Sequence, residues 1–333
     1  DVSGVKTFTG ATNVAGNLTI SGSATADATT NSTTITYNGS TAQNVAAMNY
    51  HSLTLTNAST KTFATGSTGI ASTFSITGGA TADATANTTT IDYNGAAQSV
   101  LALNYRNLTL SNSGIKTLET GSTGLTGNLS VTGTASLDAT TSFPTTVSFT
   151  GTAIQTSSAA AFYNLTVFKA SNTASFNDVT VANNFTVTAG IALVDAASFA
   201  VTGPTSISEE LRITTTTGTK SFGDIVVNNS GLLNLTVAED VTVNGDLQVD
   251  GTGSVTSNTG LWTFQASGGG TISGSAAALT ISNAEFTTNY AVNRVVTFAG
   301  LTVTGATLTN NSTVTVNTSF GGTGTFAQGN GST

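Results

Sequence analysis

The fold is decided by residues 5–60, VKTFTGATNVAGNLTISGSATADATTNSTTITYNGSTAQNVAAMNYHSLTLTNAST, because the chain repeats this stretch twice with little change. Lys6-Thr7-Phe8 recurs as Lys61-Thr62-Phe63 and as Lys116-Thr117-Leu118, a step of 55 residues each time. A fixed internal period of this length is typical of repeat architectures, in which each unit buries its apolar face against its neighbours.

A shorter period lies inside each 55-residue unit. Cores such as Asn17-Leu18-Thr19-Ile20 and Ser52-Leu53-Thr54-Leu55 alternate apolar residues with Thr, Ser or Asn. Their first apolar residues stand at positions 18, 35, 53, 74, 91, 108, 129, 147 and 165, so the steps are 17–21 residues. Alternation with period two predicts a β-strand with one buried face, and the Gly, Asn and Asp between the cores predict turns.

Strands at this spacing fit either antiparallel hairpins or the coils of a solenoid. The recurrence favours the solenoid, since equivalent residues one coil apart stack directly and a coil sequence can be reused. We therefore predict an all-β, right-handed parallel β-solenoid of about 17 coils of roughly 17–21 residues, three to each 55-residue repeat. Regular coils are expected over residues 1–172, less regular coils over residues 173–319, and a Gly-rich tail or linker over residues 320–333.

Composition and charge exclude several classes of function. The chain has eight basic and sixteen acidic residues, and no window gathers Lys or Arg, so nucleic-acid binding is not expected. No apolar run of about 18 residues occurs, so no transmembrane helix is expected. Cysteine is absent, which leaves neither disulfides nor thiol metal sites. The mean hydropathy of +0.15 and the regular alternation argue against disorder.

The two ends of the chain carry one further expectation. The chain begins at Asp1 within a repeat, which indicates an excised or processed segment. No polar capping helix is found at either end, so the terminal coils are expected to expose backbone donors and acceptors with which another copy could pair.

Candidate chemistry is sparse. His51 is the single histidine, so neither a His-based triad nor a His-cluster metal site can form, and we expect it at an exposed strand edge. Some polysaccharide lyases and glycoside hydrolases place carboxylates and a cation on one sheet of a β-helix. The residues that could meet in this way are Asp224, Glu239, Asp240, Asp246 and Asp250, with Arg212 or Arg294. Random placement explains the same pattern, so no catalytic, cofactor-binding or metal site is predicted.

A structural calcium site is left open. Asp250-Gly251-Thr252-Gly253 and Glu239-Asp240 offer the hard oxygen ligands that calcium takes, but the Gly-Gly-x-Gly-x-Asp repeat of calcium-binding β-rolls is absent.

Several recurrent residues are assigned structural roles. The lysines of the repeat are expected at a solvated edge, the aspartates in Asx turns, the asparagines in a partial ladder of stacked amides, the single tryptophan in the core, and the densest charge cluster on a loop. In the same order these residues are Lys6, Lys61 and Lys116; Asp27, Asp83 and Asp138; Asn17, Asn107, Asn128 and Asn164; Trp262; and Glu209-Glu210-Leu211-Arg212.

The repeat also supports a resemblance. Tyr-x-Asn-Leu-Thr-Leu-Ser-Asn-Ser-Gly-x-Lys-Thr, residues 105–117, followed by Gly127-Asn128-Leu129-Ser130-Val131-Thr132-Gly133, resembles the repeats of large secreted bacterial adhesin-like proteins, especially of the Bacteroidetes type. The resemblance covers residues 5 to about 170 well and the remainder only in texture. It implies a β-solenoid exported to the cell surface, with a role in adhesion, matrix or filament formation, and it carries no catalytic residues.

The function expected from this reading is structural. The chain would be an extracellular or cell-surface subunit of a filament, matrix or adhesin stalk that associates end to end with copies of itself, without membrane insertion and with surface glycans as possible further partners. Two alternatives stay open on the same scaffold: a polysaccharide-binding or polysaccharide-degrading β-helix protein, and a phage tail-fibre-like receptor-binding protein.

Overall fold

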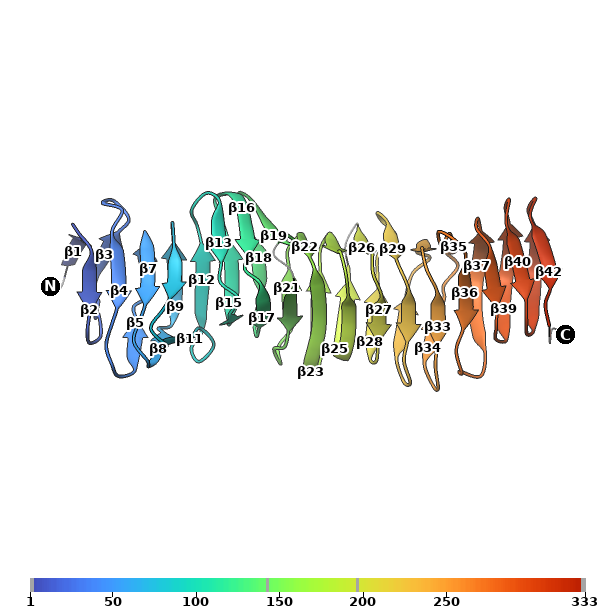
Figure 1. Ribbon diagram of the computed structural model, residues 1–333, viewed down its shortest axis with the longest axis horizontal. Coiled ribbons are helices and arrows are strands. Elements are labelled where there is room, and N and C mark those ends of the chain that lie inside the picture. The colour runs from blue at the N-terminus through green and yellow to red at the C-terminus, as the bar shows by residue number, and fades with distance from the viewer. Residues whose placement is uncertain (1–2, 142–143, 196–197, 331–333) are drawn as a thin grey trace. The chain divides into compact units, whose positions relative to one another are not determined.

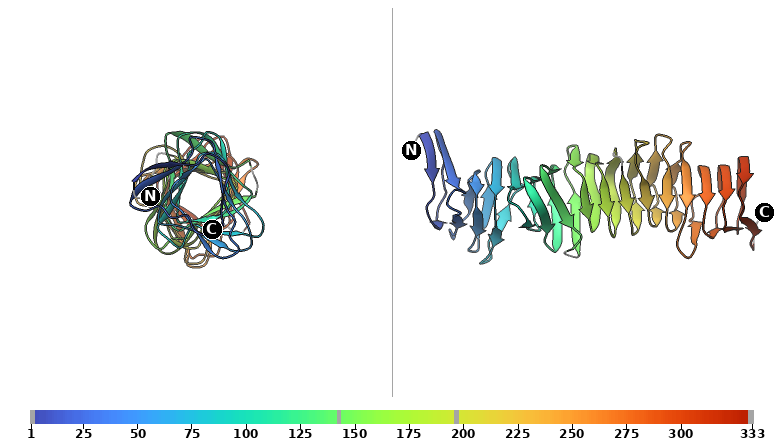
Figure 2. Two further views of the ribbon diagram at one scale, coloured as in Figure 1. Left: turned by 90° about the vertical axis from the view of Figure 1, so that its left-hand side faces the viewer. Right: turned by 90° about the horizontal axis from the view of Figure 1, so that it is seen from above.

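The computed structural model describes residues 3–141, 144–195 and 198–330. Within these residues the protein is all-β without a helix, and its parallel strands stack as a β-solenoid of about 16 turns, which confirms the predicted fold class. The chain divides into two compact units. Unit 1 comprises residues 1–151 and 155–160, and unit 2 comprises residues 152–154 and 161–333. In each unit successive turns lie side by side (Figures 1 and 2).

Short strands make up unit 1. They are β1 (Ser3–Thr7), β2 (Thr12–Val14), β3 (Ser23–Ala28), β4 (Thr34–Tyr37), β5 (Gln43–Val45), β6 (Asn49–Tyr50), β7 (Ser52–Leu55), β8 (Thr60–Phe63), β9 (Gly66–Ile70), β10 (Phe74–Ile76), β11 (Thr81–Asp83), β12 (Thr89–Tyr93), β13 (Gln98–Val100), β14 (Asn104–Tyr105), β15 (Asn107–Leu110), β16 (Ser113–Leu118), β17 (Gly121–Leu125), β18 (Leu129–Val131), β19 (Thr134–Ala139), β20 (Thr145–Phe149) and β21 (Gln155–Ser157).

Unit 2 combines short strands with a few long ones. After β22 (Ala160–Phe162), where the chain passes between units, they are β23 (Asn164–Phe176), β24 (Val179–Val181), β25 (Phe185–Val194), β26 (Phe199–Val201), β27 (Thr205–Ile207), β28 (Glu210–Ile213), β29 (Lys220–Phe222), β30 (Ile225–Val227), β31 (Leu232–Leu235), β32 (Val241–Val243), β33 (Leu247–Val249), β34 (Ser254–Thr256), β35 (Leu261–Phe264), β36 (Gly270–Ser273), β37 (Leu279–Phe286), β38 (Tyr290–Val292), β39 (Val296–Val303), β40 (Thr307–Asn310), β41 (Val314–Gly321) and β42 (Thr325–Gln328).

Each turn of unit 1 has three faces. Strands β7, β8 and β9 form one turn, and β10 begins the next turn in register with β7. Leu53 lies between Ile35 and Phe74 of the neighbouring turns, and all three side chains are buried. The threonines between the apolar residues face outward, where the hydroxyls of Thr54 and Ser75 lie 3.0 Å apart. The predicted in-register stacking of the apolar triplets is therefore confirmed within these turns.

The prediction of three turns per 55-residue repeat is wrong. Phe74 does not continue to Ile91, since Ile91 pairs instead with Thr68 of β9. One repeat holds eight strands, β9 to β16, before β17 begins the next. Eight strands on three faces advance the chain by about two and two-thirds turns, so equivalent residues of successive repeats lie on different faces. The triplet spacing of 17–21 residues hides this shift because paired positions in unit 1 are 17 to 28 residues apart.

Aromatic side chains fill the interior of unit 2. On one face, Phe222, Val243, Phe264, Phe286 and Val303 follow one another in register, one per turn. The rings of Phe264 and Phe286 stack with centroids 4.7 Å apart and planes 8° apart, which matches the strand spacing of about 4.8 Å. Trp262 is fully buried beside Phe264, as the sequence predicts.

Two assignments differ from the predictions. Glu210 and Arg212 belong to strand β28, not to a loop, because the alternating residues Leu211 and Ile213 point into the core. Residues 320–330 are not a free tail, since β42 pairs in register with β40; residues 331–333 lie outside the described residues. The two compact units divide near residues 151–161; the expected change from regular to less regular coils at residue 172 is a separate boundary and stays a prediction.

Candidate functional site

Two of the candidate carboxylates, Asp224 and Asp246, each directly precede a strand and bind the backbone of the next turn. The Oδ1 atom of Asp224 accepts the N–H of Asp246 at 2.8 Å, and the Oδ1 atom of Asp246 accepts the N–H of Thr271 at 2.7 Å. Asp224 and Asp246 are thus brought together, one turn apart, as the sequence allowed. Each satisfies a backbone donor of the following turn, which is a structural use of a carboxylate.

The other three predicted acids serve separate contacts. Asp240 accepts the N–H of Leu261 at 2.8 Å, and Asp250 accepts the N–H of Ser275 at 3.1 Å. Glu239 is buried and forms an ion pair with Lys220, with Nζ and Oε1 3.1 Å apart. Burial raises the pKa of Glu239, although Lys220 opposes the shift.

The two arginines are used differently. Arg212 pairs with Glu210 on the outer face of the same strand, with 2.6 Å between Nη2 and Oε2. Arg294 is buried, and its guanidinium donates to the carbonyls of Val249 and Ala276, both at 2.9 Å. Arg294 approaches Asp250, whose pKa is lowered mainly by a hydrogen bond from the Gln248 side chain and in small part by Arg294. Of the pairs between a candidate acid and a candidate arginine named from the sequence, only Asp250 and Arg294 come near each other within the described residues.

Metal-ligating side chains do not converge. Within the described residues, no group of three His, Asp or Glu side chains is placed to hold an ion. His51 is half-buried in a bend between β6 and β7, with Nδ1 3.3 Å from the hydroxyl of Ser52, so the expected exposed strand edge is wrong.

The predicted solvated position is wrong for two of the three repeat lysines. Lys61 and Lys116 are fully buried, not solvated, while Lys6 is exposed. The Nζ atom of Lys61 donates to the carbonyl of Gly39 at 2.6 Å, and that of Lys116 to the carbonyl of Gly95 at 2.5 Å. Each ammonium satisfies carbonyls of the loop one turn earlier, and burial lowers both pKa values. Lys169 repeats this contact in unit 2 on the carbonyl of Ala153, and burial lowers its pKa to about 8.

Three glutamines that the sequence reading missed join the same loops. Gln43, Gln98 and Gln155 follow Gly39, Gly95 and Gly151 and accept the glycine N–H at 2.7–2.9 Å. The amide nitrogen of Gln98 also donates to the carbonyls of Ile70 and Ser72 on the preceding turn, at 2.9 and 2.8 Å. The signal was available as a Gln three or four residues after each of these glycines.

The asparagine ladder exists in a different form. The side chain of Asn107 accepts the N–H of Asn128 at 3.0 Å, and that of Asn128 accepts the N–H of Thr156 at 2.9 Å. The links thus run mainly from side chain to main chain; between Asn183 and Asn164 two amides meet directly, at 2.9 Å.

The aspartates of the repeat form the expected Asx turns. The Oδ1 atom of Asp138 accepts the N–H and the hydroxyl of Thr140, both at 2.8 Å, and the N–H of Thr141 at 3.1 Å. Burial of this carboxyl raises its pKa, but the hydrogen bonds from Thr141 and Thr140 outweigh burial and lower the pKa of Asp138 to about 2. Asp27 and Asp83 form equivalent turns with lowered pKa values.

The Asp138 turn predicts a dependence of stability on acid. Because the pKa of Asp138 is lower in the folded than in the unfolded chain, its stabilisation is full above about pH 4 and is lost as the pH falls towards 2. We expect Asp138→Asn to flatten this part of the profile, measured as the melting temperature between pH 5 and pH 2. Glu119→Gln, which changes an exposed carboxylate of the same unit outside any such turn, is the control and should retain the wild-type profile.

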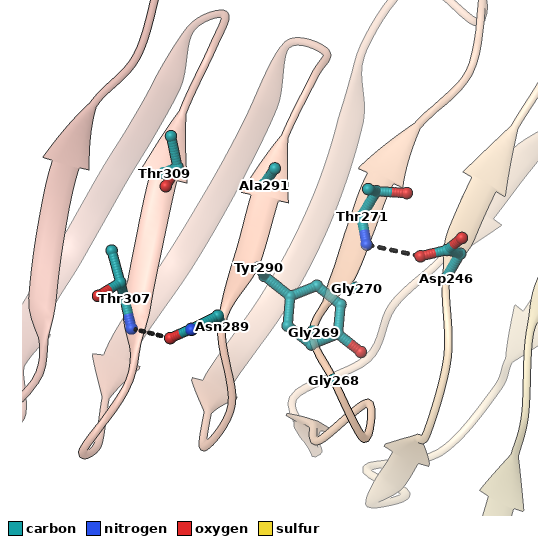
Figure 3. Close-up of a pocket in the computed structure, with 10 residues that line it drawn as sticks. All are labelled: Asp246, Gly268, Gly269, Gly270, Thr271, Asn289, Tyr290, Ala291, Thr307 and Thr309. Atoms are coloured by element: carbon teal, nitrogen blue, oxygen red, sulfur yellow. Dashed lines mark hydrogen bonds between the residues drawn. The ribbon is translucent and has the colours of Figure 1, made fainter.

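A depression of about 670 Å³ lies on the outer side of β36, β38 and β40 (Figure 3). Three glycines, Gly268 to Gly270, form one wall, where a Cβ on Gly270 would come within 2.6 Å of the Tyr290 ring. The Tyr290 hydroxyl donates inward to the carbonyl of Gly245 at 2.7 Å, so the ring offers no exposed stacking platform.

Polar groups surround the depression. Asp246 binds Thr271 on one side and Asn289 accepts the N–H of Thr307 at 2.8 Å on the other, as Figure 3 shows. These bonds use one oxygen of each side chain and leave the second oxygen of Asp246, the amide nitrogen of Asn289 and the hydroxyl of Thr309 at the surface. Such groups can bind a hydroxylated ligand but do not form a nucleophile–base pair.

Comparison of the sequence and structure with known proteins finds no matching family model, curated protein or solved structure. The described residues contain no helix that is long and apolar enough to cross a membrane.

Proposed function

We propose that this chain is a structural subunit of an extracellular stalk, filament or matrix, and that it associates end to end with copies of itself. The observation that supports the proposal is the use made of its polar side chains. The acids, lysines, glutamines and Arg294 described above bind mainly the backbone of a neighbouring turn, and little chemistry is left at the surface. A scaffold of this kind transmits load between turns and needs no catalytic residue.

The surface is compatible with self-association. Only 7% of residues are charged, and the outward rows are mainly Thr, Ser and Asn, so copies can approach without strong repulsion. Within the residues that the structure describes, β1 pairs only with β3 and β42 only with β40. Their other edges are the surfaces through which association would run.

Self-association is tested by light scattering over a concentration series. We expect the mean mass to rise with concentration and to fall again when Val5 or Phe326 is changed to Lys, since a charge on an edge strand opposes pairing. An unchanged monomer mass at high concentration would rule out self-association and leave only the spacer role.

The second candidate is glycan binding, which the depression in Figure 3 favours. A screen of immobilised polysaccharides should then find a ligand whose binding is weakened by Asn289→Ala and unaffected by Thr180→Ala on β24. The same screen tests for catalysis. New reducing ends or unsaturated products that disappear in Asp224→Ala or Glu239→Ala would overturn the structural proposal in favour of an enzyme.

A further inference from the structure

Two edge strands of unit 1 line the same cleft. Strand β10 is the last strand of its four-stranded sheet, and β13 is the first strand of the sheet that continues with β16. Among the described residues no strand pairs with the outer edge of β10. Residues of both strands, including Phe74, Ile76 and Ser99, line a cleft of about 600 Å³.

The ladder with β7 determines which backbone groups face this cleft. Leu53 donates its N–H to the carbonyl of Thr73 at 2.8 Å, and Thr77 donates to the carbonyl of Leu55 at 2.9 Å. In a parallel ladder, alternate residues direct their N–H and C=O groups to opposite neighbours. The main-chain groups of Phe74 therefore point away from β7, as do those of Ile76, and both face the cleft.

A buried tyrosine pair holds the cleft open. The Tyr93 hydroxyl accepts the N–H of Leu101 at 3.2 Å, and the Tyr105 hydroxyl donates to the carbonyl of Leu101 at 2.7 Å. The two hydroxyl oxygens lie 3.0 Å apart in the core. The backbone of Leu101 is thus bound to the tyrosines instead of to β10.

The third repeat is an internal control for this cause. Phe149 and Phe162 stand at the positions of Tyr93 and Tyr105, so both hydroxyls are missing. Ser158, the equivalent of Leu101, donates its N–H to the carbonyl of Leu129 at 3.1 Å, and β21 pairs with β18. Where both hydroxyls are missing, and Asn128 accepts the N–H of Thr156 at 2.9 Å, the two segments meet and the cleft is closed.

The first repeat lies between these two cases. The Tyr37 hydroxyl accepts the N–H of Ala46 at 2.9 Å, so the backbone is again held away from the segment before it. Here, however, Asn17 accepts the N–H of Asn44 at 2.8 Å and bridges part of the gap, and the cleft measures about 370 Å³. Thr73 replaces this asparagine in the second repeat, which therefore has the wider opening.

We propose that the cleft between β10 and β13 binds an extended polypeptide segment by strand addition. Donors and acceptors repeated at every second residue match the backbone of a peptide strand, which an edge strand recruits through main-chain hydrogen bonds. The lining side chains are small or apolar except Gln98 and Glu119, and Glu119 is the single charged residue among them. The partner segment therefore carries a Lys or Arg opposite Glu119.

The test uses the full chain and a dye-labelled peptide, Ile-Gln-Thr-Ser-Ser-Lys, whose first five residues copy residues 154–158, the segment that closes the third repeat. Binding is followed by fluorescence anisotropy. We expect Tyr93→Phe to bind roughly 10-fold more weakly or not at all, because the N–H of Leu101 is then released to pair with β10. We expect Glu119→Gln to bind roughly 2–5-fold more weakly, as for an exposed ion pair.

Tyr37→Phe is the matched control, because it removes the same hydroxyl one repeat earlier and should leave the affinity unchanged. Amide hydrogen exchange checks that Tyr93→Phe is folded and should show added protection at Ile76. Equal binding by wild type and Tyr93→Phe, absence of binding by wild type, or full displacement of the peptide by a neutral polysaccharide would each overturn the proposal. None of these outcomes bears on the light-scattering test of self-association.

Discussion

Lys220→Met is expected to lower the free energy of unfolding by about 3–5 kcal/mol at pH 8, the loss typical when one partner of a buried ion pair is removed. Both side chains of the pair with Glu239 are almost fully excluded from solvent. Lys220 also donates to the carbonyl of Thr217 at 2.8 Å, so the variant leaves this carbonyl and the buried carboxylate of Glu239 without this donor. Chemical denaturation monitored by circular dichroism measures the change.

Acid should restore part of the stability of this variant. Burial already raises the pKa of Glu239, and without Lys220 the pKa rises further. A carboxyl with a folded pKa above its unfolded value stabilises the fold below the unfolded pKa, and this contribution is lost as the pH rises through the folded pKa. We therefore expect a smaller deficit at pH 4 than at pH 8. Adding Glu239→Gln should also recover stability at pH 8; a deficit equal at both pH values would contradict this account.

Phe264→Ala is expected to cost about 3–5 kcal/mol, the usual range for removing a buried aromatic ring. The ring stacks on Phe286 and meets Tyr290 edge to face at 5.4 Å, so truncation leaves a cavity inside the aromatic column. The control is Phe320→Ala in β41, on the same face three turns later, where the ring is 59% exposed. Thermal unfolding should separate the two variants clearly, and similar losses would show that the column does not carry the stability of unit 2.

The sequence alone was sufficient to predict the strands and which of their faces are buried. Alternation of apolar and polar residues in segments such as Thr34–Tyr37 has one physical cause, a pleated strand with one buried face. The pattern therefore predicts the strand without knowledge of other turns. The Asx turn at Asp138 was predictable for the same reason, because its donors lie within three residues of the carboxylate.

Properties that depend on another turn were not predictable. From the sequence, Lys116 is expected at the surface. The carbonyls that bind it lie some 20 residues earlier, and only the fold brings them next to its ammonium group. The same holds for Gln98 and for the number of turns per repeat. The cleft was hidden for a subtler reason, since Tyr93 and Phe149 are equivalent in any apolar pattern and differ by one hydroxyl that redirects a backbone N–H.

Each repeat advances the chain by a non-integral number of turns, and this determines the directions in which equivalent features face. If each repeat contained a whole number of turns, equivalent features would all lie on the same face, and ligands bound to neighbouring repeats would obstruct one another. Here β5 and β13 occupy the same position in successive repeats but belong to different sheets, so their clefts open in different directions. A feature that recurs once in each repeat of unit 1 is therefore displayed in a different direction around the axis from one repeat to the next.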